Sequence, residues 1–416
     1  MMSKRLIPLA GLAVLILAAL ACSLPLGGSD PASTPDEVST IVAATMQALT
    51  PAAPAAGETS APAPTPVGLL PHPLYFLNND GTGLAQVFRL AVDGVTLTQL
   101  TFEPAAVEAY DVSRADGQLV YLSNNQILLV NADGAGRRVL VDGGAVDPND
   151  IFVTSLANPI FSPDGQTIAY SDEGLVLYSL ATGVSNTVLT NIETDPATGL
   201  SRVRELYIPE KYAPDGSKIL LTVAIPNSDG IGGGIYYIAP NTLTRLSGEA
   251  GFAVCCGQPE WTLDSSALYT ASSSVGMFNS GLWRIDSVSG STTTLIPAEA
   301  GGGNYNLARE PFLAPDGQLY FFYTTAPMGA DGFIERGPLQ IVRAAADGVT
   351  GRTVLRPETF EAINEALWAP DASFVVAVMS SGPGVISGGA LQLYYTDGSK
   401  SIVPLVPFGR ALKWGR

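Results

Sequence analysis

The sequence is poor in histidine, cysteine and charged residues. Its 416 residues include one His and three Cys, and only 14% are charged. One His argues against catalysis by Ser/His/Asp or Cys/His sets, and three Cys are too few for a zinc cage or a disulfide scaffold. The net charge of -17 argues against nucleic acid and anionic lipid head groups as partners. No Walker loop or dinucleotide fingerprint occurs, so we expect no cofactor and no metal.

The N-terminal segment has the layout of a secretory signal. Lys4 and Arg5 precede an apolar run over residues 6–21, which closes with Ala19-Leu20-Ala21-Cys22. At about 1.5 Å per residue the run is short for a permanent transmembrane helix. A Cys directly after small residues resembles the lipobox of bacterial lipoproteins, which implies that Cys22 is acylated, for example with palmitate. The segment departs from that pattern at Ala19 and Leu20, and ordinary secretion with a free Cys22 is the alternative.

The next segment, residues 22–70, reads as a tether. It is dominated by Pro, Ala, Ser, Thr and Gly, and such a composition buries too little apolar area to fold. Thr34-Pro35-Asp36-Glu37 supplies an N-cap, a first-turn Pro and an N3 Glu for a short helix over residues 35–49. The apolar stripe of this helix consists of Val38, Ile41, Val42, Met46 and Leu49. It is either a marginal helix that docks transiently or a contact for a partner or the membrane.

A short phrase recurs six times after the tether. Its form is a bulky residue followed by a turn such as Ser-Pro-Asp-Gly and then by an apolar run, at intervals of 48, 51, 49, 52 and 55 residues. In this turn Pro presets φ, Asp bonds nearby amides and Gly accepts positive φ. The six copies end at Gly117, Gly165, Gly216, Ser265, Gly317 and Ala372.

Each repeat predicts four short strands, which is typical of a β-propeller. Residues 71–416 resemble the WD-repeat-like propellers of the TolB type, whose repeat reads aromatic, Ser-Pro-Asp-Gly, then an apolar strand. The resemblance implies an all-β fold and protein or peptide partners. Together with the lipobox it implies a monomer anchored to the cell membrane or outer membrane, facing the periplasm or exterior. We therefore expect a binding or scaffolding module of the cell envelope and no enzyme activity.

The two ends of the repeat region predict the blade count. Three strands precede the first copy of the phrase, and Ala411-Leu412-Lys413-Trp414 repeats the form of Ala366-Leu367-Trp368 with nothing after it. The last strand is therefore expected to complete the first blade and close a ring of seven. Six blades with a frayed C-terminus is the alternative.

Candidate site residues fall into three sets. Long, varied loops on one face of the ring are the expected binding surface, and their exposed-looking groups include Tyr305, Asn306, Arg309, Glu310, Phe333, Glu335 and Arg336. The central channel is expected to contain Lys211, Glu260 and Lys413. Cys255 and Cys256 form either a strained vicinal disulfide or two small buried thiols.

An enzyme is the rival interpretation, because propellers also host glycan-cleaving and lactone-cleaving sites. It would use paired carboxylates or a bound divalent ion. Glu260, Glu310 and Glu365 stand near the starts of successive first strands and are the acids to test. Two carboxylates about 5 to 9.5 Å apart in a cleft would favour hydrolysis, whereas scattered acids would favour binding.

Overall fold

The computed structural model of the protein describes residues 68–226, 228, 230–256, 258–273, 279–329, 338–382 and 384–416. All the described residues belong to one compact unit, Val67–Arg416. The predicted signal, the tether up to residue 67 and the helix over residues 35–49 lie outside them. Strands make up 54% of the structure and helices 3%, so the fold is all-β. In the described part of the chain, no helix is both long and apolar enough to span a membrane.

There are two large sheets. The first joins strands from the two ends of the repeat region, and the second contains strands from its middle. The first has seven strands in the order β25-β26-β27-β28-β1-β2-β3. These strands are β1 Leu74–Asn79, β2 Ala85–Leu90, β3 Leu97–Gln99, β25 Ile363–Trp368, β26 Phe374–Met379, β27 Gly389–Tyr395 and β28 Val403–Trp414. The second has eight strands in sequence order. They are β8 Ala157–Phe161, β9 Thr167–Ser171, β10 Gly174–Ser179, β11 Val184–Thr194, β12 Ser201–Tyr212, β13 Lys218–Ala224, β14 Ile231–Tyr237 and β15 Thr242–Arg245.

Three smaller sheets account for the other strands. One contains β4 Val107–Val112, β5 Leu119–Ser123, β6 Gln126–Val130 and β7 Arg138–Asp142. Another contains β16 Glu260–Trp261, β17 Ala267–Ser272, β18 Gly281–Asp286 and β19 Thr292–Ile296. The last contains β20 Glu299–Gly301, β21 Asn304–Leu313, β22 Gln318–Pro327, β23 Gln340–Ala345 and β24 Thr353–Val354. Two helices, α2 Ile151–Thr154 and α3 Gly248–Cys256, lie in connections between sheets or strands.

The recurring turn joins the first and second strands of each repeat, as the sequence predicts. Between β8 and β9, the Gly165 N–H donates to the Ser162 carbonyl at 2.8 Å and Gly165 has φ 70°. The Asp164 carboxylate accepts from the Ser162 hydroxyl at 2.6 Å and from the Gln166 N–H at 3.1 Å. The predicted turn chemistry is therefore present in the structure.

All the strand pairings are antiparallel, and they form runs of four neighbouring strands. Two long strands belong to two runs each. The first part of β11 pairs with β10 and its last part with β12. Similarly, β28 pairs with β27 through Val403–Gly409 and with β1 through Arg410–Trp414. The C-terminal strand therefore joins the last strands of the chain to the first, which is the contact that the sequence predicts. The number of blades and the closure of the ring remain predictions.

The hydrophobic core is divided among seven clusters in the described residues, and each lies between two neighbouring runs of strands. One packs Tyr75 and Leu77 of β1 against Tyr110 of β4. Another packs Leu74 and Phe76 of β1 against strands β26 to β28. The bulky residue before each turn contributes to this packing; Trp261 and Trp368 are 4% and 6% exposed. These side chains therefore wedge between neighbouring repeats.

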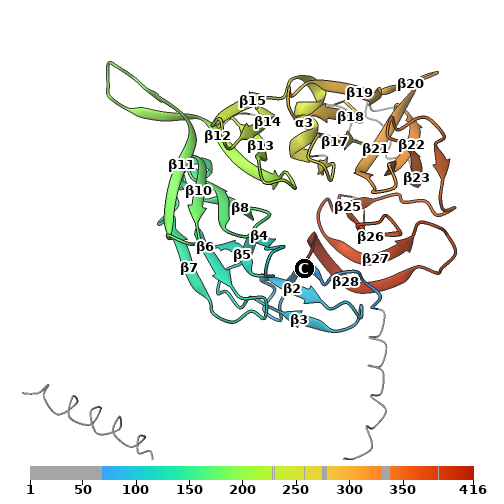
Figure 1. The fold of residues 1–416 in the computed structure, drawn as a ribbon, viewed down its shortest axis with the longest axis horizontal. Coiled ribbons are helices and arrows are strands. Elements are labelled where there is room, and N and C mark those ends of the chain that lie inside the picture. Colours follow the sequence, from blue (N-terminus) through green and yellow to red (C-terminus); the bar gives the residue numbers. More distant parts are fainter. Residues whose placement is uncertain are drawn as a thin grey trace, which may run out of the picture. The chain divides into compact units, whose positions relative to one another are not determined.

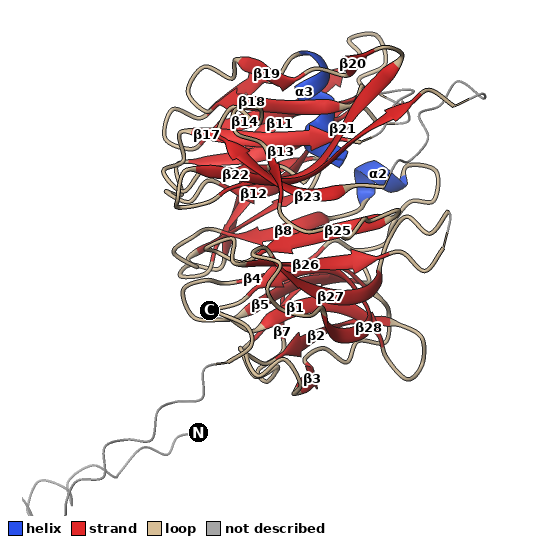
Figure 2. Ribbon diagram, turned by 90° about the vertical axis from the view of Figure 1, so that its right-hand side faces the viewer, coloured by secondary structure: helices blue, strands red, loops and turns tan. Residues whose placement is uncertain are grey.

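The runs follow one another around a centre in sequence order (Figure 1). The blue strands β2 and β3 lie beside the red strand β28, and β4, β8 and β25 lie nearest the middle. Seen from the side, α2 lies at the right-hand edge and the C-terminus on the left (Figure 2). Because β4, β8 and β25 are the first strands of their repeats, the first strands meet around the centre seen in Figure 1, where a channel is expected.

Two connections contain more secondary structure than the sequence predicts. Residues 191–209 form one of the long connections between repeats that the sequence predicts as loops, but β11 and β12 extend through much of this segment as a two-stranded ribbon. This ribbon projects from the ring in Figure 1. Its sequence explains the difference, because Val, Ile and Thr recur in β11 and favour strands. The connection before β16 contains α3, which packs Ala250, Ala253 and Val254 against β13, β14 and β17.

Candidate functional site: the channel cluster

The first strands place charged side chains in equivalent positions, directly before the bulky residue of the turn. Lys211 of β12 pairs with Glu260 of β16, and their side chains are 39% and 32% exposed. The Lys413 Nζ atom of β28 lies 2.8 Å from Oδ1 of Asp111 on β4. The structure therefore brings together two of the three predicted channel residues and pairs the third with a residue that the sequence analysis missed. We call Asp111, Lys211, Glu260, Glu310, Glu365 and Lys413 the channel cluster.

Glu365 is occupied by backbone donors. Its two carboxylate oxygens accept from the Ala411 N–H at 2.7 Å and the Leu412 N–H at 2.5 Å, which joins β25 to β28. Burial raises the pKa of Glu365, while the two N–H groups, Lys413 and Arg410 oppose that rise. This acid therefore holds the C-terminal strand in place.

Glu310 has no such partner. The residue is 4% exposed, and its Oε1 atom accepts no hydrogen bond from any of the described residues. The nearest cation is the guanidinium of Arg309, at 3.6 Å from Oε1, and that group donates to the backbone carbonyls of Ile363 and Asn364. Burial raises the pKa of Glu310 to about 8, with further upward contributions from Glu365 and Glu260. Glu310 is therefore mostly a neutral carboxylic acid at pH 7.

Glu310 also has an unusual backbone. Its φ is 51°, and Asn158, Gln258 and Ala411 have φ values of 45°, 48° and 56° three residues before the bulky turn residue of their own repeats. The strand register shifts at this point in several repeats, including β21 and β8. A β-bulge thus precedes the turn and directs neighbouring side chains toward the next repeat. In β21 it directs the Glu310 side chain inward, although the sequence suggested an exposed loop.

Tryptophan side chains add bonds between the first strands. The Trp368 indole N–H donates to the Glu310 carbonyl at 2.8 Å, and that of Trp414 donates to the Trp368 carbonyl at 2.7 Å. The Trp261 indole N–H donates to the Lys211 carbonyl at 3.4 Å. Together with the ion pairs, these bonds form what we call the inner belt.

The inner belt connects most of the first strands. Asn158 donates to the Pro209 carbonyl at 2.5 Å, and the Phe161 N–H donates to Asp111 at 2.8 Å. The belt therefore connects β16, β12, β8, β4, β28, β25 and β21. Among the described residues, no hydrogen bond joins β16 to β21, and Glu260 and Glu310 stand on the two sides of this gap. We call it the β16–β21 junction.

Glu210, which the sequence analysis missed, is another acid on a first strand. Its Oε1 atom accepts from the Thr222 hydroxyl at 2.6 Å. Burial raises its pKa, against the opposing effects of Thr222, Lys413 and Lys211. Its position next to Lys211 could have pointed to it, but strand alternation places neighbours on opposite faces.

The predicted binding-face residues do not form an exposed surface in the described part of the chain. Asn306 is 6% exposed, accepts from the Tyr323 hydroxyl at 2.5 Å and donates to the Pro297 carbonyl at 2.8 Å. The expectation that Asn306 and Glu310 are exposed is therefore wrong, because both lie inside β21 next to packed strands. Tyr305 is partly buried in the same strand. Phe333, Glu335 and Arg336 lie outside the described residues.

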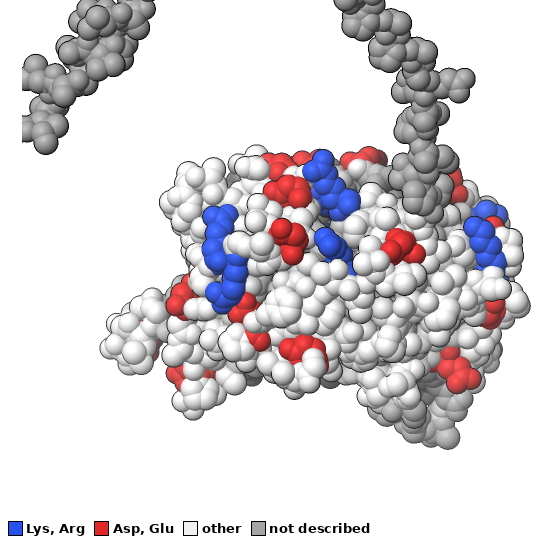
Figure 3. Space-filling view, turned by 90° about the horizontal axis from the view of Figure 1, so that it is seen from below, with Lys and Arg blue, Asp and Glu red and all other residues white. Residues whose placement is uncertain are grey.

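The cysteine predictions are not tested by the structure. Cys255 and Cys256 end α3, but their side chains lie outside what is described, as does Cys22. Among the described residues, no group of three or more His, Cys, Asp or Glu side chains is placed to hold a metal ion. Charged side chains on the face seen in Figure 3 are scattered over a largely uncharged surface.

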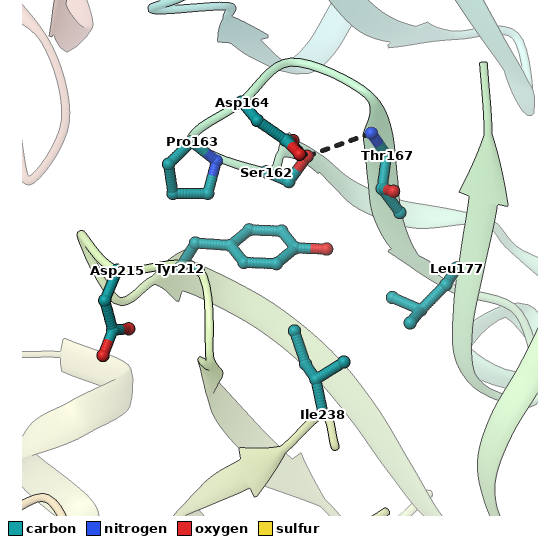
Figure 4. Close-up of a pocket in the computed structure, with 9 residues that line it drawn as sticks. Ser162, Pro163, Asp164, Thr167, Leu177, Tyr212, Asp215 and Ile238 are labelled. Carbon is teal, nitrogen blue, oxygen red and sulfur yellow. Dashed lines mark hydrogen bonds between the residues drawn. The ribbon is translucent and has the colours of Figure 1, made fainter. Parts of the chain in front are cut away.

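A cavity of about 300 Å³ lies outside the channel cluster, between two neighbouring repeats. Tyr212 crosses it, with Pro163 on one side of the ring and Ile238 on the other (Figure 4). The sequence analysis missed this cavity because its walls come from residues about 50 positions apart. The only signal was the aromatic residue that recurs before each turn.

Comparisons with known proteins agree on the fold. No protein-family model and no curated protein sequence matches the chain. An oligogalacturonate lyase in complex with manganese is 12% identical, with a TM-score of 0.50 over 80% of this chain and 85% of that one. A Mycobacterium tuberculosis puromycin-hydrolyzing peptidase is 14% identical, with a TM-score of 0.51 over 82% of this chain and 54% of that one. TolB from Acinetobacter baumannii is 15% identical, with a TM-score of 0.40 over 82% of each chain.

At these identities the likeness concerns the fold alone. The structural neighbours include TolB proteins, an oligogalacturonate lyase and peptidases. The chain spans about half the length of the peptidase. The all-β, propeller-like architecture expected from the repeat is thus supported.

Proposed function

We propose that this protein is a lipid-anchored, extracytoplasmic propeller that binds or scaffolds protein partners in the cell envelope. The observation that carries the proposal is that three acids of the channel cluster are already bonded to groups on neighbouring strands. Glu365 accepts two backbone N–H groups, Glu260 pairs with Lys211, and Asp111 pairs with Lys413. Acids committed to holding strands together are poor candidates for hydrolysis, because catalysis would require them to leave these partners.

A seven-bladed ring closed by the C-terminal strand is part of the proposal. Two observations support it over six blades. First, β28 pairs with both β27 and β1. Second, seven hydrophobic clusters follow one another around the described strands, and the cluster between β1 and β26 to β28 links the last run to the first. A closed ring of seven blades has seven interfaces between neighbouring blades, and the seven clusters match that number.

Lipid anchoring rests on the sequence of residues 1–22. The test is metabolic labelling of cells that express the full chain with an alkyne-bearing fatty acid, followed by membrane fractionation. We expect labelled protein in the membrane fraction, and expect Cys22→Ser to lose both label and sedimentation. Membrane association without any label would overturn the anchoring and leave the ring intact.

Partner binding is placed at the Lys211–Glu260 pair, whose side chains are the more exposed members of the channel cluster. A charge swap, Lys211→Glu together with Glu260→Lys, keeps an ion pair while reversing the local charges. We expect the variant to fold with an unchanged melting temperature. In intact cells, the amount of partner cross-linked to the full chain should fall at least tenfold.

The control for this swap is a double charge reversal at Arg204 and Glu193, which pair on the projecting ribbon and do not belong to the channel cluster. It should leave cross-linking unchanged. Equal capture of the partner by all three proteins would contradict binding at this pair. Absence of any cross-linked partner from the parent chain would contradict the binding role itself.

The alternative is a hydrolase or lyase that acts on a glycan or lactone through carboxylates or a divalent ion. Glu310 favours it, because a buried acid with a pKa of about 8 has the protonation state of a general acid at neutral pH. The matching test is turnover of a glycan and lactone panel by the parent chain and by Glu310→Gln. Turnover by the parent that falls at least a hundredfold in Glu310→Gln would reverse the ranking.

A further inference from the structure

The cavity beside Tyr212 is built from two neighbouring repeats. One wall is the turn between β8 and β9, which supplies Ser162, Pro163, Asp164 and Thr167. Leu177 of β10 belongs to the same repeat, and the neighbouring repeat supplies Tyr212 at the end of β12, Asp215 and Gly216 in the turn after it, and Ile238 directly after β14. Its volume of about 300 Å³ is at the small end of ligand sites, which fits one side chain of a partner better than a large cofactor.

The Tyr212 side chain combines an apolar surface with one unused polar atom. The residue is 8% exposed, and its hydroxyl oxygen is buried without a hydrogen-bond partner in the described structure. Burial raises the pKa of this phenol well above its usual range, so the hydroxyl is protonated at all physiological pH values. In Figure 4 the ring lies across the cavity and the hydroxyl points toward Thr167 and Leu177. An unsatisfied buried hydroxyl destabilises the folded protein, and a ligand bonded to it would remove that cost.

The turn above the ring supplies negative charge. Asp164 is exposed, and its bond from the Ser162 hydroxyl lowers its pKa, so it is ionised at neutral pH. In Figure 4 its carboxylate lies on the same side of the turn as the Tyr212 ring, whereas the Asp215 carboxylate points away. Asp215 pairs with Lys218 at 3.6 Å, and no ion pair occupies Asp164 in the described structure.

We propose that this cavity receives an arginine side chain from a partner protein. A guanidinium is planar and stacks on aromatic rings, and it donates in a fixed fork that suits a carboxylate. Its donors would bond the Tyr212 hydroxyl oxygen and the Asp164 carboxylate, while its aliphatic stem would pack on Leu177 and Ile238. A basic partner also complements the net charge of -17. An anionic ligand would face an unpaired Asp164, and a purely apolar ligand would leave the buried hydroxyl unsatisfied.

This inference does not depend on the proposed function of the channel cluster. The probe is an acetylated and amidated tripeptide with arginine at its centre, titrated into the full chain and followed by ligand-observed NMR. The same tripeptide with citrulline has nearly the same shape and no charge. We expect the arginine peptide to bind at least about tenfold more tightly than the citrulline peptide.

Three variants distinguish binding in the cavity from general electrostatic attraction to the acidic protein. Tyr212→Phe removes only the hydroxyl, and we expect it to weaken arginine-peptide binding about three- to tenfold. Asp164→Asn removes the charge and is expected to weaken binding about tenfold or more. Asp264→Asn is the matched control, because Asp264 accepts from the Thr262 hydroxyl at the same 2.6 Å in the equivalent turn but does not line the cavity. It should change binding less than twofold.

The opposite results would overturn the proposal. Equal affinity for the arginine and citrulline peptides would show that charge is not recognised. An equal loss in Asp164→Asn and Asp264→Asn would assign binding to the overall negative field. No binding of either peptide to the parent chain would also overturn it. Unfolding in urea, measured for each variant, keeps a folding defect from being read as lost binding.

Discussion

Two junctions between first strands differ in how their acids are used. At the contact of β25 with β28, both oxygens of Glu365 accept backbone N–H groups. At the β16–β21 junction, Glu310 is buried with one oxygen unpartnered, and its pKa rises to about 8. Both residues are glutamates in equivalent regions of the ring, so residue type does not decide their roles. What decides them is whether backbone donors reach the carboxylate.

The difference also separates a structural acid from a titratable one. A carboxylate that accepts two N–H groups contributes to stability as an acceptor and is costly to remove. A buried carboxyl without donors costs stability whenever it ionises. The C-terminal junction is therefore expected to be sensitive to truncation and substitution, and the β16–β21 junction to pH.

The largest expected effect is from removal of residues 411–416. This deletion takes away the pairing of Leu74 with Trp414 and of Tyr75 with Lys413, together with both donors to Glu365. We expect loss of the cooperative unfolding transition, measured by calorimetry and near-UV circular dichroism. Removal of Arg416 alone, which lies beyond β28, is the control. A truncated chain that melts like the parent would contradict closure of the ring by β28.

Substitution of Glu365 probes the same junction with a smaller change. Glu365→Ala leaves the Ala411 and Leu412 N–H groups without their acceptor, and we expect the free energy of unfolding to fall by about 2–4 kcal/mol. Urea unfolding at pH 7 measures the loss. Glu361→Ala, at an exposed position in the connection before β25, should change stability by less than about 0.5 kcal/mol. Similar values for the two variants would mean that Glu365 does not hold the C-terminal strand.

Glu310→Gln tests the pH dependence of the other junction. The pKa of Glu310 is about 8 in the folded protein and 4.5 ordinarily, so the folded state binds more protons than the unfolded state between these values. The contribution of Glu310 to the free energy of unfolding therefore falls as pH rises from about 4.5 to about 8, and then levels off.

The measurement is the difference between the urea midpoints of Glu310→Gln and the parent from about pH 5 to about pH 9. We expect the variant to gain stability relative to the parent as pH rises, by up to a few kcal/mol. Glu365→Gln provides the comparison at the bonded junction: the Glu365 pKa is also raised by burial, so a gain in the same direction is expected there, but it is set against loss of one acceptor oxygen for the Ala411 and Leu412 N–H groups at every pH. Parallel curves for parent and Glu310→Gln would rule out a buried, titrating Glu310.

The smallest effect is expected from the Lys413–Asp111 pair. Lys413→Met keeps the aliphatic stem and removes the charge, while Asp111 still accepts from the Phe161 N–H. Because the pair is partly exposed, we expect a loss of about 1 kcal/mol or less that shrinks at high salt. A loss as large as that of Glu365→Ala would mean that ion pairs, not backbone bonds, hold this junction.

Most of the architecture is readable from the sequence, because it depends on local chemistry. The Pro-Asp-Gly turns and the apolar runs after them predict the second strands, and the unpaired final strand predicts the β28–β1 contact. The projecting ribbon was missed because its residues 191–209 lie between repeats, where loops are the usual connection. Strand-forming side chains in β11 outweighed that expectation.

The candidate site was less predictable, because it depends on contacts between repeats. The sequence suggested the charged positions Lys211, Glu260 and Lys413, and the structure pairs each of them across a strand boundary. Asp111 was missed because its turn is one residue longer than the others, which shifts the register of the repeat. Glu310 was expected to be exposed, but a bulge at positive φ turns its side chain inward. A sequence pattern does not record backbone dihedrals, so this burial could not be predicted.

The projecting ribbon is the segment through which the chain passes from the run of β8 to β11 into the run of β12 to β15. Its strands β11 and β12 pair with each other only beyond Asn191, and their other parts belong to different runs of strands. A single protease cut between residues 195 and 200 would therefore leave every run of four intact. The two fragments should remain associated through the packing of Ile160 and Tyr207, and co-elute in size-exclusion chromatography. The ribbon thus offers a place to split the gene into two complementing pieces.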